Sequence, residues 1–245
     1  LLRTRRWRSA AAWAAVWIVL LGAAHVPLVD YRPDRGRWHF QRADAWRMCG
    51  DIDRAIAEFR LAIATGQPTD PLPHNNLGGA LLQKGQVPEA IASFREALRI
   101  DPAYAHARVN LGLAFANSGR DDLARTELEE VVRRDPEGAP ARAKLGAILM
   151  RMGLASEALP HLEAARRLVP GDTDVRYLGA LALLETGRVD EGRVLLEGVG
   201  RTEPRFSDAC VVLAELAVQH GERDRAVRLL QQALAVDPRH AGAAG

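Results

Sequence analysis

The chain has 245 residues, of which 48% are hydrophobic and 26% are charged. This composition is too apolar for a disordered chain, and its many Ala, Leu, Arg and Glu residues favour helix over strand. The 33 basic and 31 acidic residues nearly cancel, so the overall charge does not favour nucleic acid as a partner.

The first 30 residues combine a basic start with a long uncharged run. Four arginines lie within the first eight residues, and no charged residue occurs from Ala10 to Val29. At about 1.5 Å per residue, a helix of this length just crosses the hydrocarbon core of a bilayer. We therefore expect residues 1–30 to hold a transmembrane helix and the rest of the chain to lie outside the cytoplasm, in the periplasm of a bacterium.

Two alternatives for this segment stay open. A cleaved signal peptide would also have a basic start and an apolar run, and Gly22-Ala23-Ala24 would suit its cleavage site. The chain begins with Leu1, so the run could also be the last span of a longer membrane protein. Arginines on both sides of the run leave its orientation weakly defined.

After a linker at residues 31–35, the sequence repeats every 34 residues. Asn76-Leu77-Gly78, Asn110-Leu111-Gly112 and Lys144-Leu145-Gly146 show this spacing, and later glycines and prolines follow it. We expect six repeats, and residues 241–245 could begin a further helix. The expected repeats cover residues 36–70, 71–104, 105–138, 139–172, 173–206 and 207–240.

Each recurring residue fits a helix-turn-helix unit. A small residue in the first helix allows the second helix to cross closely, and a glycine between the helices permits a left-handed turn. We expect Asp122 and its equivalents Ser156, Asp190 and Asp224 to cap the second helix. An acidic residue followed by proline then ends that helix, because proline disfavours helix at the preceding residue. The small residues are Gly78, Gly112, Gly146, Ala180 and Ala214.

These residues make the chain resemble the tetratricopeptide repeat family over residues 36–240. The resemblance implies an all-α superhelical solenoid whose first helices line a concave groove for peptides or partner helices. One repeat departs from the pattern, because Gly179 replaces the usual leucine and Gly192 replaces a small alanine. We expect that hairpin to be the least stable.

The sequence contains no nucleophile elbow, phosphate loop or paired-histidine metal motif. The seven histidines are scattered, and we expect Cys49 and Cys210 to be small buried residues rather than a pair. We therefore expect no catalytic residue, no metal and no cofactor, and a chain that is not itself an enzyme.

Polar residues on the first helices are the candidates for recognition. Asn76 and Asn110 share one slot, and their amides can pair with both the donor and the acceptor of a peptide backbone. They resemble two rungs of the asparagine ladder in the repeats of O-linked N-acetylglucosamine transferase, although they could also be solvated residues. Lys144 and Arg151 make the middle basic, and acidic residues follow. The predicted groove residues are Asn75, Asn76, Asn110, Asn117, Lys144 and Arg151, and the acidic ones are Asp174, Glu185, Asp208 and Glu215.

The leading hypothesis is a membrane-anchored scaffold or adaptor that binds a protein or peptide in this groove. The alternative is a substrate-recruiting, carboxyl-terminal module of a multi-span membrane glycosyltransferase, because a last span followed by such repeats is similar to O-mannosyltransferase-like proteins. In that family the catalytic residues would lie in the multi-span part. The sequence does not define the oligomeric state.

Overall fold

The computed structural model describes residues 34–67 and 69–240. They form twelve α-helices and no strand, which confirms the predicted all-α fold for this part of the chain. The described helices are all too short or too polar to cross a bilayer, and the apolar run at residues 10–29 lies outside the described residues. The chain divides into two compact units after Gln67.

The first unit is a single helical hairpin of α2 (Arg35–Met48) and α3 (Ile52–Thr65). Aspartates begin both helices: Asp34 and Asp51 each accept a hydrogen bond from the backbone N–H three residues further on. Such side-chain caps satisfy donors that have no partner inside the helix. The Phe59 ring of α3 is fully buried and fixes the core of this hairpin.

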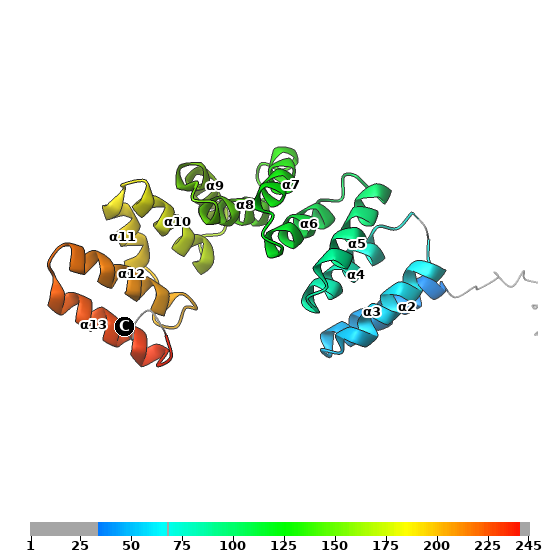
Figure 1. Ribbon diagram of the computed structural model, residues 1–245, viewed down its shortest axis with the longest axis horizontal. Coiled ribbons are helices and arrows are strands. Elements are labelled where there is room, and N and C mark those ends of the chain that lie inside the picture. The colour runs from blue at the N-terminus through cyan, green and yellow to red at the C-terminus, as the bar shows by residue number, and fades with distance from the viewer. Residues whose placement is uncertain (1–33, 68, 241–245) are drawn as a thin grey trace, which may run out of the picture. The chain divides into compact units, whose positions relative to one another are not determined.

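The second unit contains ten helices that form five further hairpins, and each helix packs against the next one along the chain (Figure 1). Helix α4 also packs against α6, and α8 against α10. These additional contacts place the first helices of neighbouring hairpins side by side. The helices are α4 (Leu72–Gln83), α5 (Val87–Ile100), α6 (Ala105–Asn117), α7 (Asp121–Arg134), α8 (Ala139–Arg151), α9 (Ala155–Leu168), α10 (Thr173–Glu185), α11 (Val189–Glu197), α12 (Phe206–Gln219) and α13 (Arg223–Val236).

The small residues of the first helices have the predicted packing role. A Cβ atom on Gly78 would lie 2.5 Å from the Phe94 ring, and one on Gly146 would lie 2.6 Å from Cγ of Leu162. Both distances are too short for carbon atoms in contact, which normally lie about 3.5–4.0 Å apart. Glycine therefore sets how closely the two helices of these hairpins approach.

The turns between paired helices confirm one prediction and correct another. The turn glycines all have positive φ angles between 73° and 82°, which suits the predicted left-handed turn. However, Asp122 and its equivalents Ser156, Asp190 and Asp224 are not caps. Each of these second helices starts one residue before these positions, so their side chains occupy its second position, where the carboxylates of the three aspartates interact with the helix dipole instead. The glycines are Gly50, Gly85, Gly119, Gly153, Gly187 and Gly221.

Helix α11 is shorter than the sequence pattern predicts. It has nine residues, whereas every other second helix among the described residues has 14. The pattern placed its end before Pro204, but Gly198 and Gly200 follow Glu197 and disfavour continued helix through their high chain entropy. Val199 instead turns inward and is buried.

The two cysteines lie in different environments. Cys210 is buried in the core around α12, as predicted, and its pKa is raised by burial. Cys49 is exposed at the end of α2, so the expectation that it is buried is wrong. In this hairpin the position that directly follows the first helix faces solvent. The presence of a cysteine there did not predict this exposure.

Candidate functional site

A groove of about 490 Å³ lies between α8 and α10 and is closed at one side by the end of α9. Its wall on α8 uses positions three and four residues apart, which share one face of a helix. Most of its lining, here called the floor, consists of small and apolar side chains, and four charged side chains complete it. The floor residues are Ala139, Pro140, Ala143, Ala147, Ala165, Val169, Val175 and Leu178, and the charged ones are Lys144, Asp172, Asp174 and Arg205.

The two basic residues of the groove differ in how their charges are balanced. The Arg205 guanidinium donates to Asp174 Oδ1 at 2.6 Å and to Asp208 Oδ2 at 3.0 Å, and these hydrogen bonds raise its pKa. Lys144 is partly buried and has no ion-pair partner within residues 34–67 and 69–240. Lys144 is therefore the basic side chain of this groove that is not held in an ion pair, and Asp172 is an acidic side chain of the groove that likewise has no ion-pair partner among the described residues.

The acidic end that the sequence suggests is partly neutralised by its own neighbours. Burial disfavours the charged form of Asp208, but hydrogen bonds from His240 and Arg205 outweigh it and lower the pKa of this carboxyl. The His240 Nε2 atom lies 2.9 Å from Asp208 Oδ1. Asp174 is paired with Arg205 as well. A ligand therefore meets ion pairs at this end rather than free carboxylates at these two residues.

The structure brings three of the predicted asparagines together. Asn110 Nδ2 on α6 donates to Asn75 Oδ1 on α4 at 2.9 Å, and Asn75 Nδ2 donates to Asn76 Oδ1 at 3.1 Å. Asn75 is buried, whereas Asn76 and Asn110 are partly exposed. Asn75 thus links the two amides that a ligand can reach, and is not itself an open contact.

The other predicted residues lie elsewhere. Asn117 is exposed at the end of α6, and Lys144 lines the α8–α10 groove. Arg151 at the end of α8 is not among the groove residues, because its guanidinium pairs with Asp121 at the start of α7. The six predicted positions therefore do not form one site.

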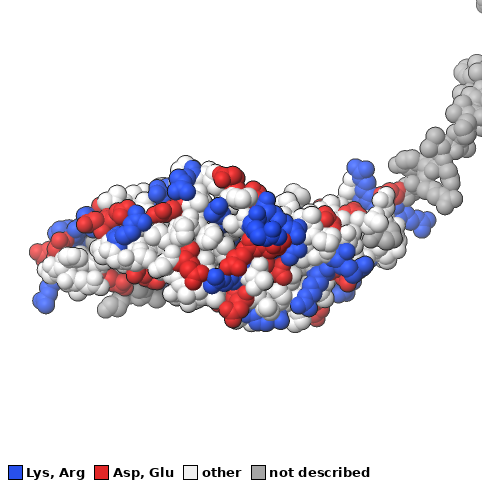
Figure 2. Space-filling view, turned by 90° about the horizontal axis from the view of Figure 1, so that it is seen from above, with Lys and Arg blue, Asp and Glu red and all other residues white. Residues whose placement is uncertain are grey.

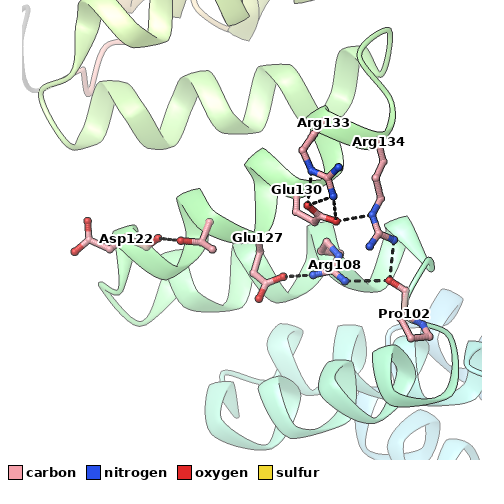
Figure 3. Close-up of polar contacts among 8 residues, drawn as sticks. Pro102, Arg108, Asp122, Glu127, Glu130, Arg133 and Arg134 are labelled. Atoms are coloured by element: carbon pink, nitrogen blue, oxygen red, sulfur yellow. Dashed lines mark hydrogen bonds and ion pairs between the residues drawn. The ribbon is translucent and has the colours of Figure 1, made fainter.

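A set of arginines that the sequence analysis did not single out recurs with the repeat period. Arg108, Arg142 and Arg176 are 34 residues apart, and each donates to the carbonyl of the proline six residues before it. Figure 3 shows Arg108 and Arg134 both reaching the Pro102 carbonyl oxygen, each at 3.0 Å. These arginines hold the turn between successive hairpins. Their identical spacing was visible in the sequence.

The exposed helix surfaces of the second unit carry ion pairs rather than a field of one sign. Glu130 accepts hydrogen bonds from Arg133 and Arg134, whose side chains lie three and four residues further along α7 (Figure 3). Acidic and basic groups alternate over the visible face in Figure 2. Exposed pairs of this kind contribute little stability, about 0–1 kcal/mol each. Among the described residues, no three His, Cys, Asp or Glu side chains are grouped so that they could hold a metal ion.

Four matches to protein-family models fall on the second unit. Residues 78–119 match a TPR repeat model, and residues 105–137, 149–209 and 209–242 match tetratricopeptide repeat models. The chain is a tetratricopeptide repeat protein. None of the curated proteins matches it in sequence.

Solved structures share the fold of this repeat protein. YrrB, described as a TPR protein with an unusual peptide-binding site, is 25% identical, with a TM-score of 0.64 over 76% of this chain and 95% of that chain. PilF of Pseudomonas aeruginosa is 20% identical, with a TM-score of 0.72 over 87% of this chain and 96% of that chain. MamA of Desulfovibrio magneticus RS-1 is 22% identical, with a TM-score of 0.64 over 70% and 97%.

Proposed function

We propose that this repeat protein is a membrane-anchored adaptor that binds an extended segment of another protein in the α8–α10 groove. The observation that carries the proposal is Lys144, a partly buried cation without an ion-pair partner among the described residues, beside an apolar floor. A ligand carboxylate would neutralise this charge where water is partly excluded, which strengthens the interaction. The preferred ligand thus carries an acidic residue next to an apolar one.

The floor of the groove supports the apolar part of this ligand. Ala143 and Ala147 leave room on α8, and Leu178 closes the opposite side from α10. A pocket that combines apolar walls with a few polar groups at fixed places binds side chains specifically. The peptide-binding site named for YrrB supports a peptide as the ligand class.

The linked amides on α4 and α6 offer contacts for a ligand backbone. Within the described residues, Asn76 Nδ2 and Asn110 Oδ1 are not used in the hydrogen bonds that join the three asparagines. One is a donor and the other an acceptor, which are the two kinds of group that bind a peptide unit. Asn75 keeps both amides in place from its buried position.

Binding can be tested with peptides selected from a displayed random library on the wild-type chain. Titration of the selected peptide should show weaker binding to Lys144→Gln, because a hydrogen bond to a charged group is worth about 1.5–3 kcal/mol, or roughly ten- to a hundredfold in affinity. The matched control is Arg167→Gln on α9, whose exposed side chain lies outside the groove. Equal affinity of wild type and both variants would refute the proposal that the peptide binds in the α8–α10 groove.

The anchor is a separate part of the proposal and has its own test. The uncharged run at residues 10–29 supports it. The full chain should stay in the membrane fraction after alkaline extraction, and a chain without residues 1–30 should be released. A full chain with an intact amino terminus that is released by alkali would contradict the anchor, while leaving the groove unaffected. Protease protection in intact cells would test the periplasmic location.

A further inference from the structure

Helix α2 differs from other first helices at two positions that face the preceding hairpin in the repeat pattern. In α6, α8 and α12, the third and seventh residues of the repeat are small or apolar and buried. In α2 the same positions hold Trp38 and Arg42, and Trp38 is 50% exposed. The buried equivalents are Ala107, Leu111, Ala141, Leu145, Ala209 and Leu213.

The exposed surface of α2 combines basic groups with large apolar ones. The helix contains four arginines and one acidic residue, Asp44. Arg35 and Arg37 have no ion-pair partner among the described residues, whereas Arg42 pairs with Glu58 and Arg47 pairs with Asp44. The Arg42 guanidinium also lies 4.5 Å from the centre of the Trp38 ring. Met48 is 82% exposed near the other end of the helix. Trp and Arg together suit the boundary between water and lipid, where the ring lies among headgroups and the guanidinium binds phosphate.

The position of α2 in the chain limits how far it can lie from a membrane anchor. Only residues 30–34 separate the uncharged run from the first residue of α2. At about 3.5 Å per residue, this connection spans less than roughly 20 Å. A chain anchored by residues 10–29 therefore keeps α2 close to the bilayer surface.

We propose that the exposed face of α2 docks on a membrane surface that contains anionic phospholipid, an inference that rests on the proposed anchor. Arg35 and Arg37 contact headgroup phosphates, and Trp38 and Met48 enter the interfacial layer. The dock fixes the first hairpin against the bilayer. It thereby keeps the connection to the repeat array at a set height above the membrane.

Two other roles for this face agree less well with its side chains. If α2 served only as the solvent-exposed end of the repeat array, its outer face would be polar and would not expose a tryptophan and a methionine. The uncharged run would be a poor cover for the face, because it would bury arginines without acidic partners. Charge complementarity therefore favours anionic headgroups as the occupant.

Cys49 provides a probe for this dock in the full chain. It is exposed at the end of α2, seven residues after Arg42 and thus on the same side of the helix, whereas Cys210 is buried. An environment-sensitive fluorophore on Cys49 reports on its surroundings after reconstitution into vesicles. The vesicles are made of phosphatidylcholine alone or of phosphatidylcholine mixed with phosphatidylglycerol, and flotation reports on vesicle binding separately.

The label should be shielded from an aqueous quencher in mixed vesicles but not in neutral ones, and high salt should remove the shielding. Each arginine near an anionic surface is worth about a fivefold factor, so Arg35→Gln with Arg37→Gln should shift the docking equilibrium about 30-fold toward the free state. The matched control is Arg223→Gln with Arg228→Gln on the exposed surface of α13, which should behave like wild type.

The outcomes separate the dock from the anchor. Flotation with both vesicles and equal quenching in both would overturn the dock and keep the anchor. Flotation with mixed vesicles alone, with a shielded label, would support the dock and refute the span. A chain that floats with neither vesicle would overturn both.

Discussion

Two neighbouring hairpins of the second unit, α8–α9 and α10–α11, share one repeat period but differ in how they pack. In the first, Gly146 accommodates the buried Leu162 side chain, and α9 runs for 14 residues. In the second, Gly179 stands where the pattern has leucine, and α11 stops after nine residues. The loop after α11 then supplies Val199 to the core.

The comparison shows that the period fixes where helices pair, whereas individual side chains fix how well they pack. The irregular hairpin recovers part of its lost burial from a loop, and the same loop ends with Arg205, which lines the candidate groove. The departure from the pattern therefore also shapes the site. Stability measurements on the two hairpins can separate these contributions.

The largest effect is expected from Leu162→Ala in the regular hairpin. Leu162 is fully buried against Gly146, so its truncation removes apolar contacts and leaves a cavity, at a cost of about 2–5 kcal/mol in the free energy of unfolding. Urea denaturation followed by circular dichroism measures this cost. Leu168→Ala on the same helix, where the leucine is 41% exposed, should cost far less. Similar losses for both variants would mean that the core between α8 and α9 is wrongly assigned.

A smaller loss is expected from Gly192→Ala in the irregular hairpin. The added methyl group would lie 2.9 Å from the Ala180 carbonyl oxygen and 2.8 Å from Cδ2 of Leu184, and the backbone atom cannot move away easily. Overpacking of this kind costs about 1–3 kcal/mol, although alanine itself favours helix. A shift of the thermal midpoint to lower temperature checks it. An unchanged or higher midpoint would show that the two helices are less close than described.

The opposite sign is expected for Gly179→Ala in the same hairpin. The nearest atom to the added methyl group would be Cβ of Leu162, at 4.0 Å, which is an ordinary contact distance. Because glycine in a helix costs roughly 0.5–1 kcal/mol relative to alanine, the variant should be more stable by about that amount. Thermal unfolding of both glycine variants side by side provides the comparison. Destabilisation by Gly179→Ala would contradict the open space at this position.

The smallest effect is expected from mild acid and should distinguish the hairpins. Burial and the neighbouring Arg142 lower the pKa of His161 on α9, whereas α10 and α11 contain no histidine. The folded state therefore prefers neutral His161, so stability is complete above the ordinary histidine range and falls as the pH drops through it. Hydrogen exchange measured between pH 7 and pH 5 should show that α8–α9 loosens before α10–α11. His161→Gln should remove part of this difference between the hairpins. Equal loosening of both hairpins, unchanged by His161→Gln, would exclude this cause.

The sequence predicted the helix pairs because Gly78, Gly146 and the turn glycines mark them at a constant spacing. It did not predict the early end of α11, because that depends on how Val199 competes for the core after Gly198 interrupts the helix. The groove was predicted only in part: Lys144 lies there, but Arg151 pairs with Asp121, a partner on another hairpin that the repeat period does not specify. Arg205 comes from the irregular loop, and the three preceding repeats hold Ala103, Glu137 and Gly171 at its position.

The central claim is that a peptide lies between α8 and α10, and photo-crosslinking tests it most directly. A photoreactive phenylalanine derivative at Leu178 would stand in the groove, and one at Val194 would stand on the exposed face of α11. With a peptide selected on the wild-type chain, we expect an adduct at position 178 that unlabelled peptide suppresses, and no adduct at position 194. An adduct at position 194 alone would contradict the account, because recognition would then use the outer helices.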